Sequence, residues 1–413
     1  MSNGEINLHT NYLGGTGLLR INTYITNIGK PAEGATVSVI DPYDNTIIEE
    51  TKTNAVGEIP PISLDAPPIE YSMEFDMPRP FNQYNVKVTK PDYTDANIFN
   101  VQVYPSATAV QEIVLKPVFE NIDIPYPTLY GDFPPKIPEA EVKKLPFPSQ
   151  QVVLPQPVIP SIIVVHAGVP EDASAPNYTV GFKDYIKNVA SSEIYTTWPR
   201  ESLKANIHVI LSFTLNRVFT EWYRGKGFDF TITNSTAFDQ AFTFGRNVFK
   251  EISDIVDEIF TTYISRPDIR QPLFTQYSDG KRVVREGWLS QWGSKALGDQ
   301  GFDALQILRN YYGSDVFIKE AEKVEGIPMS FPGTTLVIGS SGDNVRTIQE
   351  QLNAISKNYP LIPKLIEDGS YGESTAESVK IFQQIFNLPQ TGTVNYPTWY
   401  KISDVYVAIQ KLA

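Results

Sequence analysis

A proline-rich segment in the first half of the chain sets the main limit on how this 413-residue protein can fold. Proline makes up about a quarter of residues 117–160, and no apolar periodicity persists there. Because proline fixes φ and lacks an amide proton, such a run favours an extended, solvated backbone. We therefore expect a linker over 117–160 that proteases can reach, although a rigid spacer would have the same composition.

The residues before this linker predict a β-sandwich over 1–116. Short runs there alternate apolar and polar positions, as half-buried strands do, and turn residues separate them. The runs are residues 19–21, 36–40, 84–88 and 101–104. The phrases at 29–37 and 53–57 resemble the small prealbumin-type sandwich, a resemblance that implies no chemistry. A binding or inhibitory module and a spacer domain are both compatible with this pattern.

Composition restricts the partners and cofactors. A net charge of −13 argues against nucleic acid and anionic membranes as partners, because both would repel the chain. The chain has no cysteine, and its three histidines show no metal-ligand spacing, so we expect no disulfide, metal or cofactor. The first 15 residues lack the basic and apolar regions of a signal peptide, and no apolar run reaches membrane-spanning length. We expect a soluble protein without a Sec-type signal.

Residues 183–206 predict two helices that meet at a corner. Ile186, Ala190 and Glu193 share one helical stripe, and Pro199 suits the first position of a second helix that runs to about residue 223. Beside the corner at 195–198, the Glu193 carboxylate is expected to be desolvated, with a raised pKa that suits a general acid. A purely structural Glu193, which caps or pairs, is the alternative.

Four motifs follow one another between residues 162 and 318. The first comprises Tyr185, Val189, Glu193, Trp198-Pro199, Glu201 and Leu203-Lys204-Ala205, and the others are Gln240-Ala241-Phe242, Ser290-Gln291-Trp292-Gly293 and Ile307-Leu308 with Tyr311-Tyr312-Gly313. Their order resembles the glycan-cleaving domain of the stage II sporulation protein D family. The resemblance implies a lytic transglycosylase of peptidoglycan with Glu193 as its acid. The histidine that the family often carries before its third motif is missing from 284–289.

The side chains expected to contact glycan are aromatic, amide, hydroxyl or ammonium groups near these motifs. They are Tyr185, Tyr195, Trp198, Lys204, Asn234, Gln240, Ser290, Gln291 and Trp292. Local turn capping explains the polar stretch 234–240 about as well. A further helix is predicted over 246–264 and a hairpin-like turn at 279–280. Glu201 is the structural control for Glu193, because its charge near a helix start suits the helix dipole.

Residues 334–413 resemble the type 1 peptidoglycan-binding domain. Gly342-Asp343, Asp368-Gly369, Thr391-Gly392 and Trp399 carry this likeness. Two apolar faces, one with Val345 and Leu352 and one with Phe382, predict a small three-helix core. Tyr371 and Gln383 are candidate glycan contacts, while Trp399 is expected in the core.

The sequence therefore predicts a multidomain α+β protein: the prealbumin-like β-sandwich, a mixed α+β catalytic domain over 161–333, and the three-helix domain. This order resembles the pro-forms of the clostridial spore cortex-lytic enzymes. That resemblance implies a zymogen of the spore cortex or cell wall that works in germination. Its partners would be peptidoglycan glycan strands and an activating protease. A non-catalytic peptidoglycan-binding spore or wall protein, and a phage-type lysin, are the alternatives.

Overall fold

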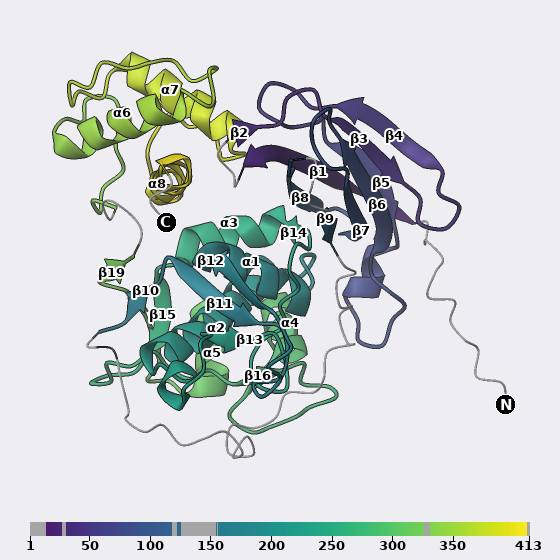
Figure 1. The fold of residues 1–413 in the computed structure, drawn as a ribbon. Coiled ribbons are helices and arrows are strands. Elements are labelled where there is room, and N and C mark those ends of the chain that lie inside the picture. The colour runs from purple at the N-terminus through teal and green to yellow at the C-terminus, as the bar shows by residue number, and fades with distance from the viewer. Residues whose placement is uncertain are drawn as a thin grey trace.

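The computed structural model describes residues 14–26, 30–117, 122–124, 154, 156–325 and 331–410. Figure 1 shows an N-terminal β domain, a mixed middle domain and a C-terminal helical module, with the β domain beside both other parts. This is the multidomain α+β arrangement that the sequence predicts.

The N-terminal β domain contains two sheets around one core. The first holds β1 (Gly15–Thr26), β2 (Lys30–Pro31), β5 (Ile62–Ala66) and β8 (Thr108–Val114), and the second holds β4 (Ile47–Lys52), β3 (Thr36–Ile40), β6 (Asn82–Thr89), β7 (Ala96–Val103) and β9 (Ile122–Ile124). Leu19 and Ile21 of the first sheet and Val37 and Val86 of the second are buried in a common apolar cluster. A short 3-10 helix, η1 (Ile69–Ser72), follows β5.

Two helices meet at the predicted corner of the middle domain. They are α1 (Phe182–Glu193) and α2 (Arg200–Phe219), with Pro199 at the N-cap of α2. The sequence predicts an apolar stripe on α2, but the helix is buried along nearly its whole circumference. The reason is its central place, since α1 and three other helices pack around it.

The other elements of the middle domain surround α2. They are β10 (Val158–Ile159), β11 (Ile162–His166), β12 (Asn177–Gly181), η3 (Arg224–Lys226), β13 (Ile232–Thr233), β14 (Val248–Phe249), α3 (Lys250–Ile259), β15 (Thr262–Ser265), β16 (Tyr277–Ser278), β17 (Leu289–Ser290), α4 (Gln291–Asp299), α5 (Ala304–Tyr312), β18 (Phe317–Glu320) and β19 (Lys323–Val324). The turn at 279–280 does not close a hairpin, because β16 and β17 are parallel.

The predicted helix over 246–264 is shorter than expected at both ends. Val248 and Phe249 form β14, which pairs antiparallel with Val110 and Ala109 of β8 in the β domain. The helix α3 starts only after this strand. A pairing partner about 140 residues away in the chain therefore overrides the local helical pattern.

The C-terminal module has the three predicted helices, α6 (Asp343–Ile355), α7 (Glu373–Ile385) and α8 (Tyr396–Gln410). Trp399 is fully buried, as predicted. Two short pieces of the predicted linker belong to neighbouring sheets: β9 pairs with β7, and β10 pairs with β19. Most of the residues between them, including the expected protease target, lie outside the described residues.

Candidate active site

Glu193 lies where three segments that are distant in sequence meet. It is the last residue of α1 and is only 7% exposed. Its Oε1 accepts a hydrogen bond from the backbone N–H of Ala241 at 2.8 Å, and its Oε2 accepts one from Gln291 Nε2 at 3.4 Å. The first three sequence motifs therefore converge on one buried carboxylate.

A chain of hydrogen bonds reaches Glu193 from the interior. Tyr185 Oη at 3.0 Å and Thr214 Oγ1 at 2.8 Å donate to Gln240 Oε1, and Gln240 Nε2 donates to Tyr277 Oη at 3.1 Å. Since the phenol accepts from Gln240, its own proton is directed to the Glu193 carboxylate. Burial, followed by the charge of Glu193, raises the pKa of Tyr277 well above its usual value.

Tyr277 is a site residue that the sequence did not predict. The motif pattern gives Gln240 but offers no sign that Gln240 contacts Glu193 only through Tyr277. The one available signal was an aromatic residue immediately before the turn at 279–280. Tyr185 and Gln240, predicted as glycan contacts, are fully buried and positioned to orient Tyr277.

Three predicted aromatic residues form a cluster next to Glu193. The ring centroids of Trp198 and Trp292 lie 5.0 Å apart, and that of Tyr195 lies 5.5 Å and 5.7 Å from them. All three contacts are edge-on. Tyr195 follows Glu193 by two residues, and Trp292 follows Gln291, so the cluster adjoins the carboxylate.

The remaining predicted residues of the middle domain have local partners. Lys204 donates to Glu258 at 2.8 Å on the outer side of α2 and α3. Ser290 caps α4 by accepting from the Gly293 N–H. Asn234 donates to the Phe242 carbonyl at 3.4 Å. Their roles as glycan contacts stay predictions. Glu201 accepts from the Ala304 N–H at the start of α5, which suits its use as a structural control.

A second buried carboxylate, Asp239, differs clearly from Glu193. It pairs with Arg217 at 2.9 Å and accepts from Tyr223 Oη at 2.6 Å and from the Thr233 N–H at 2.9 Å. Because an arginine and several internal donors engage both of its oxygens, we assign Asp239 a structural role. In the described residues, no group of three or more histidine and acidic side chains could hold a metal ion.

The β domain covers the aromatic side of the site. Ser72, at the end of η1, accepts a hydrogen bond from Trp198 Nε1 at 2.9 Å through its carbonyl oxygen. A second contact joins the two domains: the Asn247 side chain accepts from the Gln102 N–H and donates to the Gln102 carbonyl, each at 3.1 Å. Arg246 reaches from Ser192, beside Glu193, to the Gln102 side chain.

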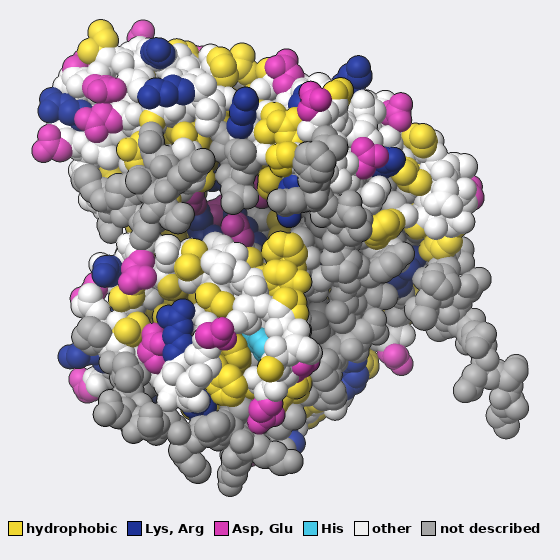
Figure 2. Space-filling model, in the orientation of Figure 1, with side chains coloured by type: hydrophobic (Ala, Val, Ile, Leu, Met, Phe, Trp, Pro, Cys, Tyr) yellow, Lys and Arg dark blue, Asp and Glu magenta, His cyan; other side chains and the backbone are white. Residues whose placement is uncertain are grey.

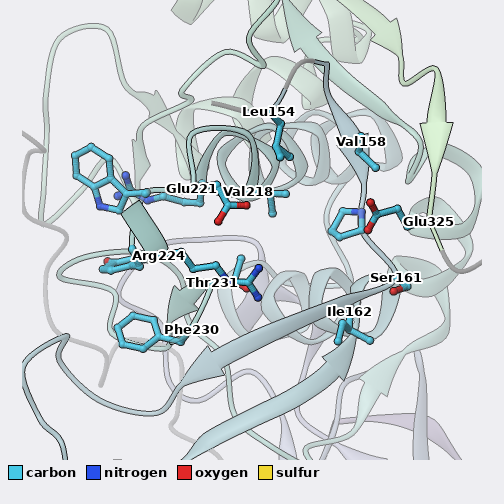
Figure 3. A pocket seen from close by; sticks show the side chains of 14 residues that line it. Leu154, Val158, Ser161, Ile162, Val218, Glu221, Arg224, Phe230, Thr231 and Glu325 are labelled. Atoms are coloured by element: carbon cyan, nitrogen blue, oxygen red, sulfur yellow. The ribbon is translucent and has the colours of Figure 1, made fainter. Parts of the chain in front are cut away.

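The middle domain also contains a cavity of about 380 Å³, shown in Figure 3. It opens beside the C-terminal end of α2, and Glu221, Trp222, Thr231 and Glu325 are among its lining residues. Glu193 is not among them, so this cavity is separate from the converging motifs.

The two candidate glycan contacts of the C-terminal module are interior. Tyr371 is 2% exposed and donates to the Gly392 carbonyl at 3.0 Å. Gln383 is fully buried, donates to the Thr393 carbonyl at 2.9 Å, and accepts from the Gly392 N–H. Both hold the turn at 391–393, and direct glycan contact stays a prediction.

The comparison with known families covers the C-terminal module. Residues 341–402 match the family model PG_binding_1, a peptidoglycan binding domain. No curated protein matches the chain. Among the described residues, no helix has the length and apolar character needed to cross a membrane. The chain therefore carries a peptidoglycan-binding domain near its C-terminus, which associates it with the cell wall.

Proposed function

We propose that this protein is a lytic transglycosylase that cleaves peptidoglycan between N-acetylmuramic acid and N-acetylglucosamine. The observation that carries the proposal is the convergence of three motif segments on the buried carboxylate of Glu193, beside an aromatic cluster. The peptidoglycan-binding domain in the same chain supports the substrate class. The setting in the spore cortex during germination rests on the resemblance described above.

Glu193 acts twice in the proposed reaction. As an acid it gives its proton to the glycosidic oxygen, and the bond from that oxygen to C1 of the muramic acid breaks. The resulting carboxylate then takes the proton of the C6 hydroxyl, and O6 bonds to C1 to close a 1,6-anhydro ring. The proton returns to Glu193 and no water is consumed, so a second carboxylate at glycosidase spacing is unnecessary.

The groups around Glu193 have distinct tasks in this proposal. The Ala241 N–H, Gln291 and Tyr277 fix the position of the carboxyl group through donated hydrogen bonds. Gln240 and its two donors fix Tyr277 in turn. Such support keeps a catalytic group within the narrow range of positions that proton transfer requires.

Product analysis tests the proposal directly. Mass spectrometry of peptidoglycan digested by the purified protein should detect 1,6-anhydro-muropeptides. Glu193→Gln should lower their release by about 10²–10⁴-fold, while Glu201→Gln should not. Reducing-end products would indicate a hydrolase of the lysin type. Wall binding without any release would favour a non-catalytic wall protein.

The N-terminal β domain is, in the same proposal, a removable pro-region. Its contacts with Trp198 and the 246–247 segment cover the site. Cutting the linker leaves the β8–β14 pairing intact, so activity should rise with dissociation of the β domain and not at the moment of the cut. Gel filtration of the nicked protein, assayed alongside, separates the two events.

A further inference from the structure

Part of the β domain lies on the aromatic cluster of Tyr195, Trp198 and Trp292. The covering segment is residues 69–76, which we name the η1 loop. Trp198 and Trp292 are 3% and 6% exposed. Two tryptophan rings at a domain boundary, next to a candidate acid, form an apolar surface that the β domain covers in this structure.

The η1 loop contacts the cluster through an amide carbonyl, a hydroxyl and a ring. The Ser72 carbonyl accepts from Trp198 Nε1, and the Ser72 hydroxyl accepts from Thr197 Oγ1 at 2.7 Å. The Phe75 ring lies edge-on to Trp292, with centroids 5.9 Å apart. An amide carbonyl and a hydroxyl beside an apolar ring face are also what an N-acetylated sugar presents.

The fit of the η1 loop is incomplete. Trp292 Nε1 is buried and has no hydrogen-bond partner among the described residues. A buried N–H that lacks an acceptor destabilises the state in which it is left unpaired. Phe75 remains 38% exposed, so the loop also leaves part of its own ring in solvent. A ligand that offers acceptors to both indole N–H groups would therefore have an advantage over the loop.

The geometry points to a subsite for an N-acetylated hexosamine, made by Trp198, Trp292, Tyr195 and Thr197, which the η1 loop fills as an internal substitute. In this arrangement the sugar acetamido carbonyl takes the place of the Ser72 carbonyl on Trp198 Nε1. A second acceptor of the sugar pairs with Trp292 Nε1, and the aromatic edges support the apolar face of the ring. The inference rests on the proposed function, because the subsite adjoins Glu193.

The η1 loop is attached less firmly than the rest of the β-domain contact. Residues 74–77 are exposed, and Asp76 has a left-handed φ of 67°. The β8–β14 pairing and the contacts of Gln102 do not involve the loop. Loosening the loop should therefore uncover the subsite without separating the two domains.

A binding experiment without catalysis tests the inference. In full-length Glu193→Gln protein, adding Ser72→Ala and Phe75→Ala removes the hydroxyl and ring contacts of the loop. Titration with N-acetylglucosamine tetramer, followed by tryptophan fluorescence and calorimetry, should show about tenfold tighter binding. Ile48→Ala, at an exposed site on β4, is the matched control. The C-terminal module contributes equally in every variant.

Two outcomes would overturn the subsite. One is a loop variant that binds the tetramer no better than the Ile48→Ala control. The other is a gain that survives Trp292→Phe, which keeps an aromatic ring, though a smaller one, and removes the indole N–H group. Circular dichroism checks that each variant is folded. Because the test measures binding and not cleavage, the subsite can stand if Glu193 proves non-catalytic, and catalysis can stand if the subsite fails.

Discussion

The middle domain meets its two neighbours in different ways. Toward the β domain it uses paired strands, the buried amides of Gln102 and Asn247, and an aromatic contact of Tyr104 with Phe249. Toward the C-terminal module it uses an ion pair of Lys183 with Asp404. The ring of Phe260 also contacts Tyr396 and Tyr400 of α8. Figure 2 shows acidic and basic side chains deep in the hollow that separates the upper and lower halves of this face.

The two boundaries differ in composition, and this indicates that they have different roles. A boundary built like a protein interior holds one geometry and opens only when many contacts break together. The second boundary includes an ion pair, Lys183 with Asp404, whose side chains are 13% and 34% exposed, so it responds to salt and acid as well. The candidate acid lies at the first kind of boundary, whereas the second kind joins the domain that binds peptidoglycan. The boundary that covers the candidate site should therefore be the less sensitive of the two to salt and acid.

The largest predicted effect comes from breaking the β-domain boundary at Phe249. This side chain is fully buried, and Phe249→Ala should lower the free energy of unfolding by about 3–5 kcal/mol. Urea unfolding measures the loss. Phe249 also serves the middle-domain core, so a double-mutant cycle with Tyr104→Ala is needed to isolate the contact across the boundary. That cycle should give a coupling of about 0.5–1.5 kcal/mol, and zero coupling would show that the two domains do not stabilise each other there.

The ion pairs of Asp257 with Lys183 and Lys187, within the middle domain and next to the C-terminal module, should weaken in acid. Burial alone would raise the pKa of Asp257, but Lys187 and Lys183 lower it to about 2. A lowered pKa in the folded state means that the stabilisation is complete above about pH 4 and is lost as the pH falls toward 2. The loss amounts to about 2 kcal/mol.

Thermal unfolding at pH 4.5 and pH 2.5 measures this change. Asp257→Asn should already be destabilised at pH 4.5 and should lose less than the wild type on acidification. If the wild type and the variant lose equal stability between the two pH values, the acid response belongs to another group.

The sequence predicted the elements whose causes are local. The helices that meet between Glu193 and Pro199 follow from apolar spacing and from the preference of proline for helix starts. The strand at Val248–Phe249 was missed because its partner β8 lies in another domain. The stripe predicted on α2 was too narrow, because polar residues such as Asn206 and Thr214 are buried with internal hydrogen bonds. Periodicity cannot distinguish those residues from solvent-exposed ones.

The candidate site shows the same limit. Sequence motifs identified Glu193, Gln240 and Gln291, and the hydrogen bonds bring these three together. They did not identify Tyr277, which belongs to no motif and matters because it links Gln240 to Glu193. They also gave no sign that Ser72, in a domain predicted as a separate unit, lies on Trp198. Contacts between domains leave no short-range pattern in the sequence.

Removing the phenol hydroxyl beneath the β-domain boundary should have an intermediate effect. Tyr277→Phe keeps the ring and deletes the donor to Glu193. If Tyr277 positions the acid, release of anhydro products should fall about tenfold, which corresponds to about 1.4 kcal/mol. Affinity for the N-acetylglucosamine tetramer should not change. An equal loss in binding and in rate would instead mean that the variant disturbs the fold, which circular dichroism would detect.

The smallest effect is expected at Lys204, which lies on neither boundary and so provides the reference for both. Its ammonium group pairs with Glu258, and the two side chains are 26% and 40% exposed. Pairs of this kind contribute about 0–1 kcal/mol, so Lys204→Ala should lower the free energy of unfolding by no more than that. The lysine was predicted as a glycan contact because it belongs to the first motif, but its partner draws it to the outer side of α2. Binding of the N-acetylglucosamine tetramer to the loop-loosened variant should therefore be the same with and without Lys204→Ala. A clear loss of binding would return Lys204 to the glycan site and would require α2 and α3 to rearrange when the β domain leaves.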